Sequence, residues 1–133
     1  MNILKFRAWH IESKVMLDVI GLTFHPVLEI YCGENEHGEE LLFTADEVTL
    51  MQSTGLTDKN GVEIFCDDIL QTNDSYSVRK HQVIWGGRDY PAFDLMPNMD
   101  GSCNNLSLAF AEGWEVEVIG NIHANADLLN DPN

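Results

Sequence analysis

The sequence predicts a mainly β protein, of the β-rich α+β kind, built from short strands in one or more small barrels. Apolar and polar residues alternate over short runs, the runs are rich in Val, Ile and aromatic residues, and turn-forming residues separate them. Many short strands divided by turns are typical of small barrels. The length of 133 residues suits a single domain, with two subdomains at most.

The first part of the chain is predicted to form hairpins. Residues 5–10 (KFRAWH) alternate, and a mostly polar tetrad separates them from the run at 15–20, which predicts a first hairpin. Residues 27–32 and 41–43 are further strand-like runs. The acidic stretch at 33–40 between them predicts an exposed turn.

The central stretch at 50–70 (LMQSTGLTDKNGVEIFCDDIL) predicts a tight turn followed by the beginning of another strand. Asn60-Gly61 is a strong hairpin signal, because both positions tolerate positive φ, and Asp58 can accept hydrogen bonds from the backbone that follows it. Asp58, Asn60 and Glu63 also suggest a calcium loop. However, Gly61 is the fourth residue counted from Asp58, whereas an EF-hand loop places glycine sixth. We therefore favour a structural turn over a metal site.

Two more strands are predicted at 81–87 and 92–97, joined through the turn formers between them. The segment at 97–110 mixes turn formers with spaced apolar residues and is compatible with either a loop or a helix.

The C-terminal part begins with a strongly alternating run. Residues 114–122 place Trp and Val on one side and Glu on the other, so we expect a strand with Gly113 and Gly120 at its limits. Residues 124–130 (ANADLLN) predict a short terminal helix with Asn125 as its N-cap.

The charge of the chain is strongly negative. Seven Lys and Arg face 22 Asp and Glu, which gives a net charge of −15, and the imbalance is spread along the chain. Direct binding of nucleic acid needs clustered basic residues, so this composition argues against it. The excess of acid favours solubility, and the alternative is a decoy surface that occupies another protein's nucleic-acid channel. With neither a membrane-length apolar run nor a signal peptide, we expect a cytoplasmic protein.

Candidate chemical groups are scattered. The three cysteines, Cys32, Cys66 and Cys103, lie far apart, as do the five histidines, so we expect reduced thiols, no structural zinc and no cofactor. Asp67 and Asp68 suggest an acid/base pair, but neighbours on a strand point to opposite sides. We expect one of them to accept backbone hydrogen bonds where the next strand begins.

Three tryptophans, Trp9, Trp85 and Trp114, fall in different predicted strands. With basic residues between them they would suit base stacking, but close basic companions are few. We expect these side chains to pack in the core or at its edge.

Three segments together resemble the YopX family of small phage and prophage proteins. They are KFRAWH at the start, MQSTGLTDKNGVEIFCDDIL in the centre and EVIGNIHANADLL near the end. The family pattern is similar to Met-Gln-x-Thr-Gly-Leu-x-Asp-Lys-Asn-Gly-x-Glu-Ile, which matches Met51 to Ile64 here. One departure concerns Asp67, which replaces a family glycine, so either an aspartate adopts positive φ there or the turn differs.

The resemblance implies a β-rich fold with an SH3-like barrel in the C-terminal half and carries over no catalytic residue. We expect one domain over 1–133, with possible subdomains at 1–66 (β hairpins) and 67–133 (the barrel). The residues expected to shape turns and the motif are Thr54, Gly55, Asp58, Asn60, Gly61, Glu63, Asp68, Gly120 and Asn121.

The leading functional hypothesis is a non-enzymatic accessory protein that binds a host or phage protein. The alternatives are an acidic nucleic-acid mimic that inhibits a host nuclease or DNA-binding protein, and a small metal-dependent hydrolase using Asp67, Asp68 and a distant histidine. Short strands leave edges to cover, so we also expect a homo-oligomer. The candidate interaction surface comprises Glu34, Glu36, Glu39, Glu40, Arg88, Asp89 and Tyr90.

Overall fold

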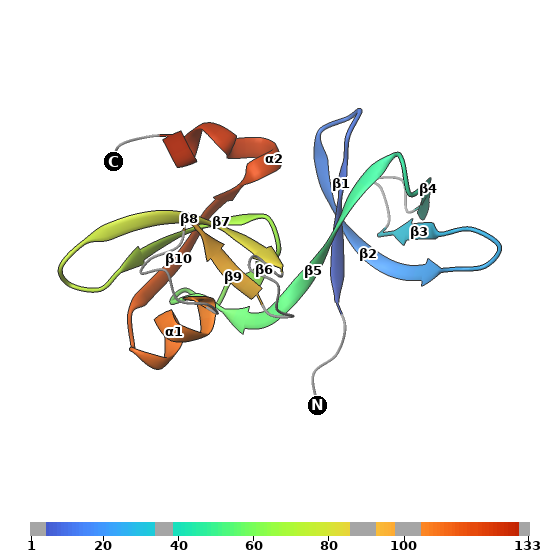
Figure 1. The fold of residues 1–133 in the computed structure, drawn as a ribbon. Coiled ribbons are helices and arrows are strands. Elements are labelled where there is room, and N and C mark those ends of the chain that lie inside the picture. The colour runs from blue at the N-terminus through green and yellow to red at the C-terminus, as the bar shows by residue number, and fades with distance from the viewer. Residues whose placement is uncertain (1–4, 34–38, 86–92, 98–104, 131–133) are drawn as a thin grey trace. The chain divides into compact units, whose positions relative to one another are not determined.

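A computed structural model describes residues 5–33, 39–85, 93–97 and 105–130, and Figure 1 shows its course. The chain divides into two compact units, Met1–Ser53 (unit 1) and Thr54–Asn133 (unit 2). Residue 66, after which we expected a boundary between subdomains, lies inside unit 2. Ile64, just before it, is fully buried in the core of that unit. The mainly β class with a short C-terminal helix is confirmed.

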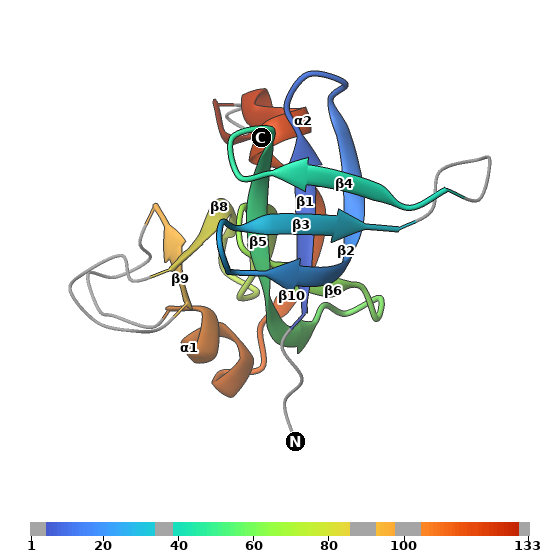
Figure 2. The same ribbon diagram turned by 90° about the vertical axis from the view of Figure 1, so that its right-hand side faces the viewer.

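Unit 1 is an antiparallel sheet. Its strands are β1 (Phe6–His10), β2 (Val15–Thr23), β3 (Glu29–Cys32), β4 (Leu41–Thr44) and the first part of β5 (Val48–Thr57). The sheet order is β4-β3-β2-β1-β5-β6, where β6 is the short strand Glu63–Phe65, and Figure 2 shows β4, β3 and β2 following one another. The predicted first hairpin is β1–β2, in which Arg7 lies opposite Asp18 and Trp9 opposite Met16. One core cluster supports this unit and consists of Ala8, Ile30, Cys32 and Val48.

Unit 2 contains the end of β5, the short strand β6 (Glu63–Phe65) and a four-stranded antiparallel sheet. That sheet is formed by β7 (Asp68–Asn73), β8 (Val78–Trp85), β9 (Phe93–Met96) and β10 (Glu115–Asn121), in the order β10-β7-β8-β9. Among the described residues, these pairings do not close the sheet into a barrel. Its core consists of Ile64, Leu70, Val83, Leu95, Leu106, Ala109 and Val116.

The ambiguous segment at 97–110 includes a helix, α1 (Asn105–Ala111), which contacts β9 and β10. Leu106 and Ala109 lie three positions apart and are both buried, so one face of α1 covers the core. The helix ends at Ala111, and the chain then turns at Gly113, whose φ of 73° suits glycine. Trp114 N donates to Ala109 O at 3.0 Å and Gly113 N to Phe110 O at 3.2 Å, which is the Schellman pattern.

The C-terminal segment folds as α2 (Ile122–Asn125) followed by the 3-10 helix η1 (Ala126–Asn130). The expectation that Asn125 caps this helix is wrong. Asn121 is the N-cap, and its side chain accepts hydrogen bonds from His123 N at 3.0 Å and Ala124 N at 2.9 Å. Asn121 takes this position because it is the last residue of β10, in extended conformation, directly before the first helical turn.

Gly120 does not mark the end of a strand, as we expected, but lies within β10 where the register with β7 shifts between Val118 and Gly120. A Cβ at this position would lie 2.5 Å from Asn125 Oδ1. That oxygen accepts a hydrogen bond from Asn121 N at 3.2 Å. Glycine is therefore required by the close approach of the Asn125 side chain.

His81 is a buried structural histidine at the centre of the second sheet. Its Nδ1 lies 2.7 Å from Pro97 O and its Nε2 3.1 Å from Thr72 Oγ1. A carbonyl only accepts, so Nδ1 carries the proton and Nε2 accepts from the threonine hydroxyl. Burial lowers the pKa of His81, the Pro97 carbonyl partly opposes this, and nearby Arg79 lowers it again. The imidazole is therefore held neutral as part of the core.

None of the described helices has the length and apolar character needed to cross a membrane.

The packing at Gly120 yields a prediction. Gly120→Ala should lower the free energy of unfolding by about 1–3 kcal/mol, because the added methyl group displaces Asn125. Asn125→Ala alone should cost less, and the double variant should be more stable than the sum of the single changes implies. Urea unfolding of all four proteins measures this coupling, and additive effects would contradict the proposed contact.

Candidate functional site

Asp58 organises the turn between β5 and β6. Its Oδ1 accepts hydrogen bonds from Asn60 N at 2.8 Å and Val62 N at 2.9 Å, which forms an Asx-turn. Its backbone carbonyl accepts from Gly61 N at 3.0 Å, and Gly61 has a φ of 81°. The polar residues of the turn that contains Asn60-Gly61 therefore fix the direction of the backbone.

The same carboxylate also reaches β10. Asp58 Oδ2 accepts a hydrogen bond from Val118 N at 2.8 Å, and Lys59 N donates to Val116 O at 3.0 Å. Lys59 Nζ adds ion pairs with Glu115 at 3.7 Å and Glu117 at 3.6 Å. The turn is thus bonded to an edge of β10 by both backbone and side chain.

The position of Asp58 favours its charged form. Burial raises the pKa of this carboxyl group, but the N–H groups of Val118, Val62 and Asn60 and the charge of Lys59 lower it, and the net result is a lowered pKa. The side chain is 6% exposed, so its oxygens are directed to the backbone. Among the described residues, no group of three or more His, Cys, Asp or Glu is placed to hold a metal ion.

Thr54 and Gly55 shape the end of β5. Thr54 Oγ1 donates to Ile64 O at 2.7 Å and accepts from Leu56 N at 3.2 Å, and Gly55 has a φ of 80°. Thr54 thereby links β5 to β6, the strand that carries Glu63.

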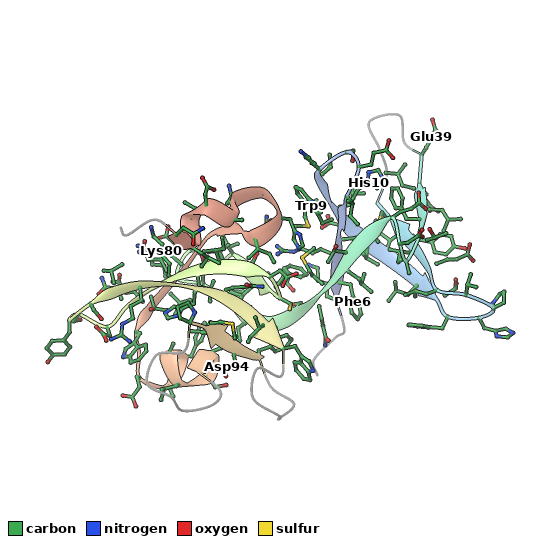
Figure 3. The ribbon with its side chains drawn as sticks, turned by 45° about the horizontal axis from the view of Figure 1, so that its top comes forward. Phe6, Trp9, His10, Glu39, Lys80 and Asp94 are labelled. Carbon is green, nitrogen blue, oxygen red and sulfur yellow. The ribbon has the colours of Figure 1, made fainter. Side chains whose placement is uncertain are left out.

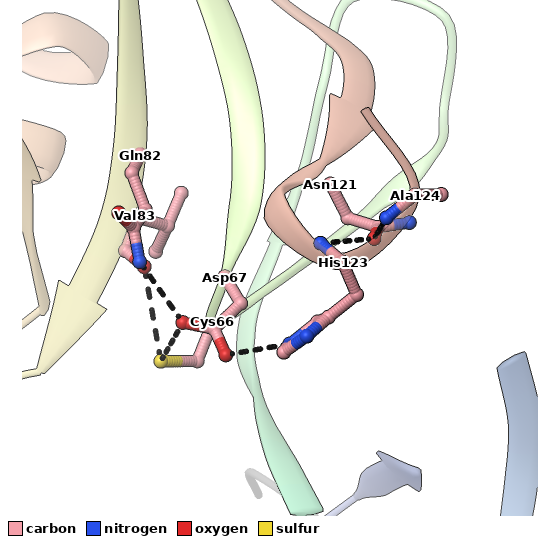
Figure 4. Close-up of polar contacts among 7 residues, drawn as sticks. All are labelled: Cys66, Asp67, Gln82, Val83, Asn121, His123 and Ala124. Atoms are coloured by element: carbon pink, nitrogen blue, oxygen red, sulfur yellow. Dashed lines mark hydrogen bonds and ion pairs between the residues drawn. The ribbon is translucent and has the colours of Figure 1, made fainter. Parts of the chain in front are cut away.

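A second polar cluster surrounds the turn between β6 and β7, shown in Figure 4. Asp67 adopts a φ of 71°, so an aspartate does take the left-handed conformation at this position. Its backbone N donates to Val83 O at 2.8 Å, and its carbonyl accepts from Ile122 N at 3.0 Å. The turn is thus held between β8 and α2.

The Asp67 carboxylate makes the polar contacts of this cluster. Its Oδ2 lies 3.1 Å from His123 Nε2, and its Oδ1 accepts from Gln82 Nε2 at 3.2 Å. The Cys66 thiol contacts Asp67 Oδ1 and Val83 O, both at 3.8 Å. Asp67 lies between Cys66 and His123 in Figure 4. A carboxylate between thiol and imidazole is not the order of a nucleophile activated by histidine.

Asp68 serves a different purpose from its neighbour. It is 1% exposed, and its Oδ2 accepts a hydrogen bond from Phe65 N at 2.8 Å. The two adjacent carboxylates therefore contact different partners. The hydrolase hypothesis needed both acids beside a histidine, and the structure brings only Asp67 to His123.

Sequence reasoning missed the contact between Asp67 and His123, which joins residues 56 positions apart. The isolated histidine and the adjacent acids gave no spacing signal for it. The only available hint was that both residues lie in segments resembling the YopX family.

The other residues of interest are placed as follows. Glu39 and Glu40 are exposed on unit 1, and Figure 3 shows Glu39 at its periphery. Glu34, Glu36, Arg88, Asp89 and Tyr90 lie outside the described residues.

The tryptophans differ from one another in exposure. Trp114 packs against the core of unit 2 from the position before β10. Trp85 is 55% exposed at the end of β8, although we expected it to pack in the core or at its edge. Its ring packs edge-on against Phe93, with centroids 4.8 Å apart, so a neighbouring aromatic covers part of it.

These features define a small β protein in which conspicuous acidic residues satisfy backbone hydrogen bonds at turns. Residues 5–130 match the family described as "YopX protein", and the chain belongs to the YopX family, which has no established function.

Two solved structures resemble this chain. Protein EF1440 from Enterococcus faecalis is 29% identical, with a TM-score of 0.64 over 97% of this chain and 99% of its own. Protein yopX from Bacillus subtilis is 18% identical, with a TM-score of 0.60 over the same shares, and supports the fold alone. No curated protein matches the chain.

The Asp58 contacts predict a pH-dependent contribution to stability. Asp58→Asn should lower the free energy of unfolding at pH 7 by about 1–3 kcal/mol, because an amide cannot accept at both former oxygens. The pKa of Asp58 in the folded protein lies below its usual 3.8. The stability that the charged carboxylate contributes is therefore fully present above pH 3.8 and is lost as the pH falls through the folded pKa. Urea unfolding between pH 7 and pH 2.5 should therefore show the two proteins converging in acid.

Asp74→Asn provides a matched control for this experiment. Asp74 accepts local hydrogen bonds in the exposed β7–β8 turn, from Tyr76 N, Ser77 N and Ser77 Oγ, and the bonds from the two backbone N–H groups lower its pKa as well. Asp74→Asn should lower the free energy of unfolding at pH 7 by less than Asp58→Asn does. An equal loss for both variants would contradict the importance of the bond to β10.

The Asp67 turn yields a separate prediction. Asp67→Ala loses the carboxylate contacts and keeps a Cβ at positive φ, where alanine lacks the short polar side chain that lets aspartate tolerate this conformation, so it should cost about 2 kcal/mol. Asp67→Gly loses the same contacts but removes the strain of a Cβ at positive φ. The free energy of unfolding of this variant should therefore be about 1 kcal/mol higher than that of the alanine variant. Thermal unfolding compares the two, and equal stabilities would show that the turn does not require left-handed backbone.

Proposed function

We propose that this protein is a non-enzymatic accessory protein of a phage or prophage that acts by binding a protein partner in the host cytoplasm. The observation that supports this most is a set of exposed apolar side chains on the β2–β3 hairpin of unit 1. Ile20, Phe24 and Val27 are 56%, 74% and 58% exposed. We call these three residues the hairpin surface.

Single exposed apolar residues are common on proteins, but a group of large ones on one element is typical of interaction sites. The unit is able to bury apolar residues, since Ala8, Ile30 and Cys32 are fully buried in the same sheet. The exposure of the hairpin surface is therefore a local property of β2 and its connection to β3. Contact with a partner would remove this apolar area from water.

A second candidate function is nucleic-acid mimicry, which the net charge of −15 favours. An acidic surface is attracted to the basic channel of a nuclease or DNA-binding protein and competes with DNA for it. The two candidates differ in one measurable respect, because only a mimic is displaced by duplex DNA.

The test is affinity capture from lysates of Bacillus subtilis and Enterococcus faecalis, followed by mass spectrometry and binding measurements with the purified partner. Phe24→Ser/Val27→Ser should weaken partner binding about tenfold or more, because interface anchors dominate binding energy. Tyr76→Ser is the matched control, because Tyr76 is 96% exposed on a different hairpin in unit 2.

Three outcomes decide between the candidates. A partner lost with the double variant and retained with the control supports the proposal. Displacement of that partner by duplex DNA supports mimicry instead. Absence of any specific partner, or enzymatic turnover by the purified protein, contradicts the proposed function.

A further inference from the structure

We infer that the hairpin surface docks a protein patch that is apolar at its centre and basic at its rim. This inference rests on the proposed function and adds the chemistry of the partner. It follows from the geometry of β2, from a hollow beside it and from the acidic residues around it.

Ile20 lies at a bulge in β2, on the strand face opposite to Leu17 and Val19, which pack on the core. Val19 lies opposite Cys32 and Gly21 opposite Tyr31, so Ile20 is an extra residue without a counterpart on β3. A bulge redirects the side chain that it carries, and here that side chain is large and apolar. Phe24 and Val27 follow in the connection between β2 and β3.

A hollow of about 230 Å³ lies beside Ile20, lined by Lys5, Phe6 and residues 19–22. It is smaller than the roughly 300–1,000 Å³ of typical small-molecule pockets. Lys5 and backbone atoms make part of its lining polar, and the other lining side chains are apolar or absent, so its apolar part suits an apolar side chain of a partner. The apolar centre of the docking surface thus includes both a projection and a hollow.

Acidic residues flank this apolar centre. Asp18 is exposed on β2 two positions before Ile20. Val19 on β2 pairs with Cys32 on β3, which in turn pairs with Leu41 on β4. The exposed Glu39 and Glu40 directly precede Leu41 in the chain. The four residues of β3 put its two ends about 10 Å apart at 3.3 Å per residue, and Glu39 and Glu40 lie somewhat farther than this from Phe24 and Val27, because both groups lie beyond the ends of β3. One interface of about 800 Å² per partner spans that distance.

The charge of unit 1 selects the partner. Residues 1–53 contain nine Asp and Glu against three Lys and Arg. A second copy of this chain would bring another net charge of −15 to the surface, so electrostatic repulsion opposes self-association there. A partner with Lys and Arg around an apolar patch complements both features.

The experiment places a photo-cross-linking amino acid at position 24, and in a control protein at position 76, and applies both to the two lysates. Cross-linked peptides identify the partner and the contacted patch. Binding of the purified partner is then measured for Glu39→Lys/Glu40→Lys and for Glu112→Lys/Asp127→Lys. The control pair changes net charge equally, at exposed positions of unit 2.

We expect cross-links from position 24 to a patch that contains apolar residues and Lys or Arg. Reversal of Glu39 and Glu40 should weaken binding about tenfold at 0.05 M salt, and less at 0.5 M salt because exposed charges are then screened. The control pair should weaken it less at both concentrations.

The outcomes separate the inference from the proposed function. A cross-link to a second copy of this chain, a patch without basic residues, or equal effects of the two charge reversals would overturn the inference while leaving partner binding in place. Cross-links from position 76 but not from position 24 would do the same. Absence of cross-links from both positions would contradict the proposed function itself.

Discussion

The carboxylate of Asp58 is the interaction on which the second unit depends most. It accepts three backbone N–H groups, two within its own turn and one, from Val118, on β10. A neutral side chain of similar size has no second acceptor for these donors, and a buried N–H without a partner is costly. One acid thus closes the β5–β6 turn and fixes it to a strand 60 residues further along the chain.

The same physical rule accounts for the other conspicuous polar residues. Asp68 accepts from Phe65 N, Asn121 caps α2, and Thr54 bonds Ile64 O. Asp68 and Asn121 lie where a strand or helix begins or ends and leaves backbone groups without regular partners, and Thr54 lies within β5 next to Gly55, whose φ is 80°. A motif rich in Asp, Asn and Thr therefore marks changes of chain direction in this fold. The polar side-chain atoms of this motif already form hydrogen bonds with the backbone.

This rule also explains how far the sequence could predict the molecule. Asn60-Gly61 and the alternation at 114–122 are local signals, and both segments fold as expected, as a turn and as β10. The contacts of Asp58 with Val118 and of Asp67 with His123 were not predictable from spacing. Every residue but proline has a backbone N–H, so a bond to one leaves no mark in the sequence. Gly120 was misplaced for the same reason, because its requirement arises from Asn125 across a turn.

The side chains that hold the turns differ from those that the fold leaves exposed, and this difference bears on function. Where motif side chains are occupied in holding turns, binding must use side chains that the fold leaves exposed. Ile20, Phe24 and Val27 belong to unit 1 and lie outside the central motif. A bulge and a connection tolerate changes of side chain better than a buried turn does, because few internal contacts constrain them. Under the proposed function, members of one family can therefore share the turns that build the fold while presenting different surfaces to different partners.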